Sequence, residues 1–119
     1  MKFNSKHIEI SDEEFGCTIT FSESENDIDS KDSEKYLLLQ RTYPEDEYEE
    51  DYYYIESSDF DKSGELENFS IELSTNKFNL STETSAFEIN FDLNTEKYEL
   101  LKQTLIKLCN GNGEINFRT

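Results

Sequence analysis

Few side chains in this sequence of 119 residues could carry out catalysis. Its one histidine, His7, would have to activate any serine or cysteine nucleophile. It stands on the polar side of an expected strand, and no partner for it can be identified. The two cysteines, Cys17 and Cys109, fall on apolar stripes and are expected to be small core residues, and they lack a disulfide or zinc spacing. We therefore expect no catalytic residue and no enzyme activity.

One segment, from Asp59 to Gly64, resembles the opening of a calcium loop. It has oxygen-bearing side chains at positions one, three and five and glycine at position six. Position twelve is Ser70, where a bidentate glutamate is needed, and the expected flanking elements are strands. A turn that uses aspartate and glycine for backbone reasons explains the segment better. Phosphate-binding glycine loops are absent as well, so we expect no metal site and no cofactor.

Tyrosines and carboxylates are concentrated between Tyr36 and Tyr54. This segment holds six of the seven tyrosines, interleaved with six acidic residues from Glu45 to Asp51. Tyrosine is enriched at interface hot spots, and carboxylates around such anchors suit a partner rich in lysine and arginine. The alternative is a set of ordinary strand tyrosines beside a solvated loop. The residues that we expect to bind a partner are Tyr43, Glu45, Asp46, Glu47, Tyr48, Glu49, Glu50, Asp51, Tyr52 and Tyr54.

The charge balance restricts the class of partner. The chain has 28 acidic and 11 basic residues, a formal net charge of −17. From Glu23 to Asp61 there are 15 acidic and 3 basic residues, a net of −12. Such a surface repels nucleic-acid phosphates and anionic membranes and attracts basic proteins. We expect no nucleic-acid or membrane partner; acidity that only maintains solubility is the alternative.

The elements that must position these residues are mostly strands. Apolar and polar residues alternate in the ranges 15–21, 69–73 and 87–93, which is typical of strands with one buried face. Short apolar runs at 36–39 and 52–55 predict two more strands. The first of these should be central and covered on one side by another layer.

Further strands are expected at both ends of the chain. The range 3–10 predicts a first strand, and Ile115 with Phe117 could form a short last one. A hairpin turn at 75–77 should lead into a strand through Phe78 and Leu80.

The period changes to that of a helix between Asn94 and Cys109. Asn94 can cap the helix, and Asn110 is a plausible C-cap. An apolar stripe for packing on a sheet is formed by Tyr98, Leu101, Leu105 and Leu108.

These elements together predict an α+β protein. We expect an antiparallel β-sheet of about six to eight strands with one major C-terminal helix packed on one face. Residues 1–119 should form a single domain with acidic loops near 22–34 and 44–51. The start of the chain lacks an apolar signal segment and nothing approaches a membrane span, so we expect a cytoplasmic monomer.

The order of these features resembles the immunity protein 10 family of bacterial polymorphic toxin systems. The similarity covers roughly residues 35–110, and its most specific part is the string from Tyr36 to Arg41, followed by an acidic loop, the 53–56 strand, a Ser63-Gly64 turn and the C-terminal helix. A glycine pair expected after that turn is replaced by residues 65–68. The resemblance implies stoichiometric inhibition of a cognate toxin in the cytoplasm, with no chemistry of its own.

Two functions follow as hypotheses. The first is a toxin-neutralising immunity protein whose partner is a basic toxin; a nuclease would offer a basic cleft that an acidic surface could occlude. The second is an acidic cytoplasmic chaperone of a secreted effector. Such chaperones usually begin with a helix and form dimers, whereas this chain is expected to begin with a strand.

Overall fold

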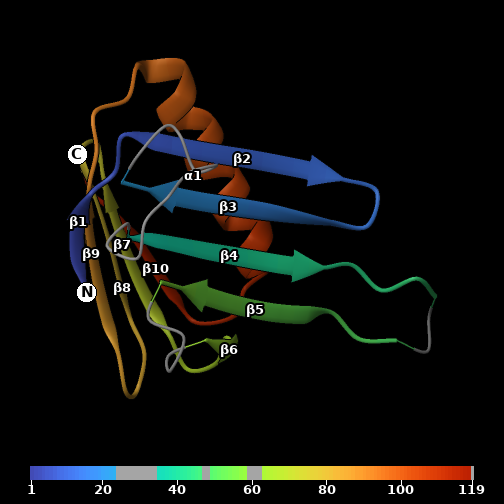
Figure 1. Cartoon of the computed structure of the whole chain (residues 1–119). Coiled ribbons are helices and arrows are strands. Elements are labelled where there is room, and N and C mark those ends of the chain that lie inside the picture. The colour runs from blue at the N-terminus through green and yellow to red at the C-terminus, as the bar shows by residue number, and fades with distance from the viewer. Residues whose placement is uncertain (24–34, 47–48, 59–62, 119) are drawn as a thin grey trace.

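The computed structural model describes residues 1–23, 35–46, 49–58 and 63–118. In those residues the chain forms ten strands and one helix, α1 (Figure 1). The protein is α+β, as predicted, with the helix packed against a sheet. The strands form two five-stranded sheets, however, where the sequence predicts one sheet of six to eight. Among the described residues, no helix is long and apolar enough to cross a membrane.

Sheet A is mixed. Its strands, in spatial order, are β1 (Lys2–Asn4), β9 (Ala86–Asn90), β8 (Lys77–Ser81), β7 (Ser70–Ser74) and β10 (Glu114–Phe117). The three central strands form the predicted antiparallel meander, and the predicted last strand is present as β10. Both edge strands pair in parallel with their neighbours.

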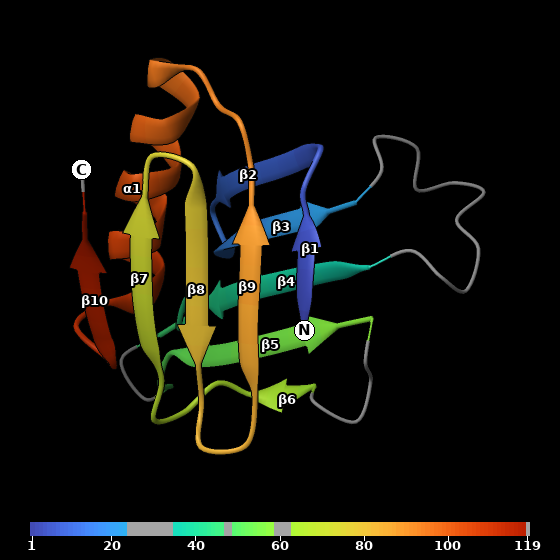
Figure 2. The ribbon, with the colours of Figure 1, turned by 90° about the vertical axis from the view of Figure 1, so that its left-hand side faces the viewer.

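Sheet B is antiparallel throughout. Its strands, in spatial order, are β2 (His7–Glu13), β3 (Gly16–Ser22), β4 (Tyr36–Thr42), β5 (Tyr52–Ser57) and β6 (Gly64–Glu65). β4 occupies the predicted central position. The strands of the two sheets run across one another, as Figure 2 shows.

The chain changes sheets at Ser5, and this is why the predicted first strand is two strands. The backbone N–H of Ser5 donates to Asn90 O at 2.7 Å in sheet A. Its hydroxyl donates to Ser22 O at 3.0 Å in sheet B. One residue between the two strands therefore hydrogen-bonds to both sheets, and a period-2 pattern cannot reveal that the strand breaks there.

Both sheets and the helix share one hydrophobic core. Phe21 of β3 is fully buried and stacks on Phe78 of β8, with ring centroids 4.7 Å apart, and on Phe91 at 6.4 Å. Cys17 and Cys109 are buried, which confirms them as core residues, and burial raises the pKa of Cys109 to about 12.

Helix α1 spans Thr95–Cys109 and begins and ends at the predicted caps. Asn94 Oδ1 accepts the N–H of Lys97 at 2.7 Å, and Asn110 adopts the left-handed conformation with φ of 49°. The predicted stripe is buried at its three leucines, while Tyr98 is half-buried. The helix lies across β2, β3 and β4, so the Leu37–Leu39 region lies beneath it.

Candidate partner-binding surface

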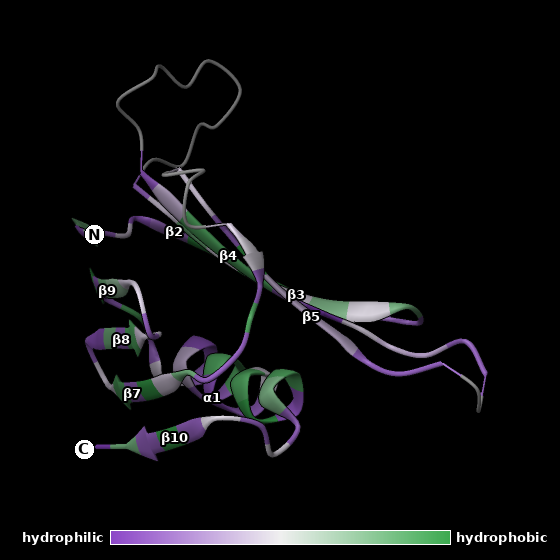
Figure 3. Ribbon diagram, turned by 90° about the horizontal axis from the view of Figure 1, so that it is seen from below, coloured by the Kyte–Doolittle hydropathy of each residue, from purple (hydrophilic) through white to green (hydrophobic). Residues whose placement is uncertain are grey.

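Within the described residues, no helix or strand covers one face of sheet B. Sheet A and α1 both lie on its opposite face (Figures 1 and 3). The strand register places the even-numbered residues of β4 and β5 together on the open face. We call the central part of this surface the tyrosine face; it consists of Tyr36, Leu38, Tyr52, Tyr54 and Glu56.

A single carboxylate organises the tyrosine face. Glu56 accepts the hydroxyl of Tyr36 at 2.8 Å and the hydroxyl of Tyr54 at 2.9 Å, one on each oxygen. The ring of Tyr54 stacks on that of Tyr52, with centroids 6.5 Å apart. The rings are therefore held in place before any partner arrives, which lowers the conformational entropy lost on binding.

The pKa values of both phenols are raised, for different main reasons. Burial is the main cause that raises the pKa of Tyr36 to about 12, with the hydrogen bond to Glu56 second. For Tyr54 the hydrogen bond to Glu56 is the main cause of a raised pKa. Because the folded pKa of Tyr36 exceeds the unfolded value near 10, its contribution to stability is complete below about pH 10 and is lost as the pH rises towards 12.

The substitution Glu56→Gln tests this arrangement. We expect the pKa of Tyr54 to fall towards its ordinary value, while that of Tyr36 stays raised because burial dominates it. The measurement is an alkaline titration of the tyrosine ring signals by NMR, with Glu9→Gln on the same face as the control. An unchanged Tyr54 titration would contradict the assignment.

The predicted acidic loop continues from the end of the tyrosine face, between β4 and β5. Glu45, Asp46, Glu49 and Glu50 are exposed there. Glu49 accepts the backbone N–H of Glu45 at 3.1 Å, which folds the loop back on itself. Two predicted binding residues, Glu47 and Tyr48, lie outside the described residues.

The structure separates two of the predicted residues from the rest. Tyr43 and Asp51 flank the loop but face the helix side of sheet B. Tyr43 donates its hydroxyl to Asp12 Oδ1 at 2.7 Å, and burial followed by this hydrogen bond raises its pKa. Lys107 donates to the other oxygen of Asp12 at 2.6 Å, and this is the main cause that lowers the pKa of Asp12.

Asp51 belongs to a second polar cluster, at the end of α1. Its Oδ2 accepts from Arg41 and from the Asn110 side chain, each at 3.2 Å, and from the Tyr53 hydroxyl at 3.3 Å. Arg41 also donates to Lys107 O at 2.7 Å, a carbonyl of the last helical turn. These contacts tie the base of the acidic loop to the helix C-terminus.

Sequence reasoning missed Tyr36, Leu38 and Glu56 as surface residues. The apolar run of β4 predicted a central strand covered on one side, and in that run only Leu37 and Leu39 are fully buried. The alternation of side chains along a strand could have identified the tyrosine face from the sequence. Tyr52, Tyr54 and Glu56 are two residues apart in one strand, so they must share a face.

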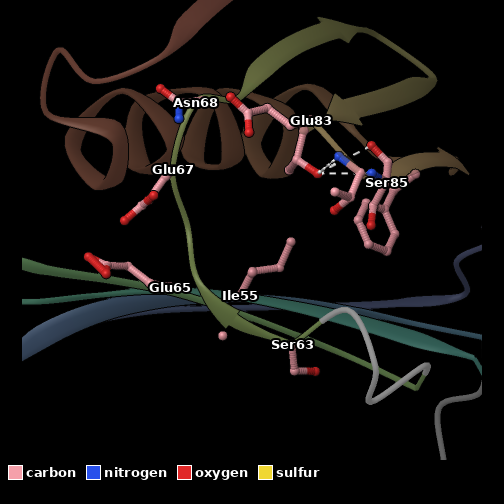
Figure 4. Close-up of a pocket in the computed structure, with 11 residues that line it drawn as sticks. Ile55, Ser63, Glu65, Glu67, Asn68, Glu83 and Ser85 are labelled. Carbon is pink, nitrogen blue, oxygen red and sulfur yellow. Dashed lines mark hydrogen bonds between the residues drawn. The ribbon is translucent and has the colours of Figure 1, made fainter.

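An acidic pocket of about 270 Å³ opens where β6 approaches the β8–β9 turn (Figure 4). Glu65, Glu67 and Glu83 line it, and Thr82 Oγ1 accepts the N–H of Ser85 at 3.0 Å at its rim. Such a lining suits a lysine or arginine side chain better than an apolar ligand.

The other chemical candidates are placed as follows. His7 is exposed and shares the open face of sheet B by register, as predicted for a polar position. Residues 59–62 of the calcium-like segment lie outside the described residues, while Ser63 Oγ accepts the N–H of Ser57 at 3.1 Å. In the part of the chain that is described, no three His, Cys, Asp or Glu residues group as metal ligands.

No protein-family model, curated protein or solved structure matches this chain.

Proposed function

We propose that this protein binds a basic protein through the tyrosine face and the acidic β4–β5 loop, and thereby neutralises a bacterial toxin. The observation that carries the proposal is the pre-ordered set of Tyr36, Tyr52 and Tyr54, on the sheet face that no described element covers. Rigid aromatic anchors of this kind supply most of the energy at protein interfaces.

The surrounding charge specifies the partner's chemistry. The exposed carboxylates of Glu45, Glu49 and Glu50 extend from one end of the tyrosine face, and Glu65 lies beside it on β6. Complementary charge speeds association and excludes acidic proteins. In this proposal Tyr43 and Asp51 act indirectly. Tyr43 bonds to Asp12 of β2, which pairs with Lys107 of α1, and Asp51 accepts from Asn110 at the end of α1.

The resemblance to the immunity protein 10 family implies that the partner is a toxin. A direct test is to co-express the chain with the products of the genes that flank its own. The proposal requires that one flanking product stops growth when expressed alone, and that this chain restores growth and forms a stoichiometric complex with it. A secreted effector held by a dimer would instead indicate the chaperone, and absence of any basic partner would refute the proposal.

Charge reversal tests the loop. The triple substitution Glu45→Lys, Glu49→Lys and Glu50→Lys is expected to lower the association rate with the toxin about tenfold at low salt. The effect should shrink at high salt, because screening removes long-range attraction. Stopped-flow or biosensor kinetics at two salt concentrations measure it.

The control is a second triple variant with the same change in net charge, placed away from the acidic loop. The exposed residues Asp92, Glu99 and Glu114 lie in or beside α1 and sheet A, and their reversal to lysine should slow association less. Equal slowing by both triple variants would show that net charge alone matters and that the loop is not the contact.

A further inference from the structure

The two sheets have four edges in the described residues, and the β2 edge differs from the others. β1, β6 and β10 have three, two and four residues, so they offer little backbone to another strand. β2 has seven residues, contains no proline and pairs with β3 in an unbroken register. It is the outermost strand of sheet B in Figure 1. Proteins usually shorten, bulge or cover such edges, because they pair readily with another chain.

The hydrogen-bond alternation shows which groups of β2 point outward. Tyr43 N–H donates to Phe15 O at 2.9 Å, and Glu23 N–H donates to Lys35 O at 3.0 Å. The odd-numbered residues of β3 therefore bond to β4, and the even-numbered ones bond to β2. The even-numbered residues of β3 lie opposite odd-numbered residues of β2, so the odd-numbered residues of β2 bond to β3 and the even-numbered ones point away from it. The N–H and C=O groups that point away from β3 are those of Ile8, Ile10 and Asp12. Ile8 is buried, so within the described residues Ile10 and Asp12 are the accessible ones.

A groove of about 390 Å³ runs beside this edge, between β2 and α1. Ile10 and Asp12 line it on the strand side. The helix side is formed by residues about one turn apart, which are Leu100, Gln103, Thr104 and Lys107. Leu100 is 47% exposed, one of the few large apolar side chains left in solvent. A strand added to β2 would direct alternate side chains over this stripe and cover Leu100.

We infer that β2 is a docking edge, at which an extended segment of the basic partner adds antiparallel as a further strand of sheet B. Main-chain hydrogen bonds to Ile10 and Asp12 would supply affinity, and the groove beside Leu100 would receive apolar side chains. The identity of the partner as a basic protein rests on the proposed function; the open edge and the groove do not.

Charge selects this occupant over a second copy of the chain. Glu9 and Glu13 of β2 are exposed on the face away from the groove, so a neighbouring strand with lysine or arginine there would be paired. Two copies would each bring a net charge of −17 to the contact, and their repulsion opposes pairing.

The probe is a capped seven-residue peptide in which lysine alternates with valine, titrated into the full isotope-labelled chain and followed by NMR. In an antiparallel pair, the peptide residue directly opposite Ile10 exchanges main-chain hydrogen bonds with it and points its side chain to the same face, towards the groove. The peptide is designed so that valine takes this position. We expect shifts centred on β2 and Leu100. The same peptide N-methylated at its valines keeps its charge but loses these donors, and should bind at least about tenfold more weakly.

Two matched variants test the groove. Leu100→Gln should weaken peptide binding about fivefold, because the peptide's valines lose an apolar contact. Ile106→Gln changes a similarly exposed residue of the same helix, 50% exposed and outside the groove, and should change binding less than about twofold.

Either of two results would overturn the inference. Equal binding of both peptides, with shifts on the acidic loop, would mean that charge alone attracts the peptide. Self-association of the chain that Leu100→Gln abolishes would mean that a second copy occupies the edge. Neither result bears on the basic partner, which the loop variants test separately.

Discussion

Replacing Phe21 with alanine is expected to lower the free energy of unfolding by about 3–5 kcal/mol. Phe21 is fully buried in β3, and its ring stacks on Phe78 and Phe91 across the junction of the two sheets. Alanine removes the ring that contacts Phe78 and Phe91, so a cavity is left where the sheets meet. Native domains of this size are stable by about 5–15 kcal/mol, so the variant should be close to unfolding at ambient temperature. Urea unfolding followed by circular dichroism measures the change.

Phe15→Ala is the matched control for this experiment. Phe15 lies in the turn before β3 and is 65% exposed, and its backbone carbonyl, which accepts from Tyr43, is unaffected by the substitution. We expect a change below about 0.5 kcal/mol. Similar losses for both variants would contradict the placement of Phe21 as the contact between the sheets.

The second large effect is expected for Arg41→Met, about 2–3 kcal/mol of unfolding free energy. Methionine keeps the apolar stem but removes the donors to Lys107 O and to Asp51. The side chains of Arg41 and Asp51 are only 14% and 20% exposed, so water can replace those donors only in part. Within the described residues, Arg41 Nε and Asp51 Oδ1 already lack a hydrogen-bond partner. Removing the remaining donors of Arg41 would therefore leave further buried polar atoms of this cluster unpaired.

A double-mutant cycle with Asp51→Asn separates the ion pair from the packing of Arg41. The double variant should lose less than the sum of the single losses, because each single change leaves the other group unpaired. Arg118→Met is the control, since Arg118 pairs with Glu72 at 3.0 Å in solvent and should contribute below about 0.5 kcal/mol. Simple additivity would contradict the pairing of Arg41 with Asp51.

Local elements could be predicted from the sequence because short-range rules specify them. Period-2 alternation depends only on neighbouring residues, so β3, β7, β8 and β9 are where the pattern predicts them. The caps of α1 at Asn94 and Asn110 likewise depend on side chains within one turn. The open face of β5 was accessible by the same rule, since Tyr52 and Tyr54 had to lie together.

The division into two sheets could not be predicted, because it depends on contacts between distant residues. Ser5 hydrogen-bonds to Asn90 in one sheet and to Ser22 in the other, and the alternation of residues around Ser5 does not predict this. The candidate surface was divided for the same reason. Tyr43 and Asp51 resemble their acidic and aromatic neighbours in sequence, yet Asp12, Arg41 and Asn110 engage them beside the helix.

By itself the sequence determined the α+β composition, the strand faces, the capped helix and the strong negative charge, since each follows from residue types and their spacing. Only the tertiary structure decided which tyrosines face outward, which carboxylates are paired internally and that β2 is the longest edge strand among the described residues. Those features depend on which segments pack together, and that is settled by the shared core around Phe21 rather than by any neighbouring residues in the chain.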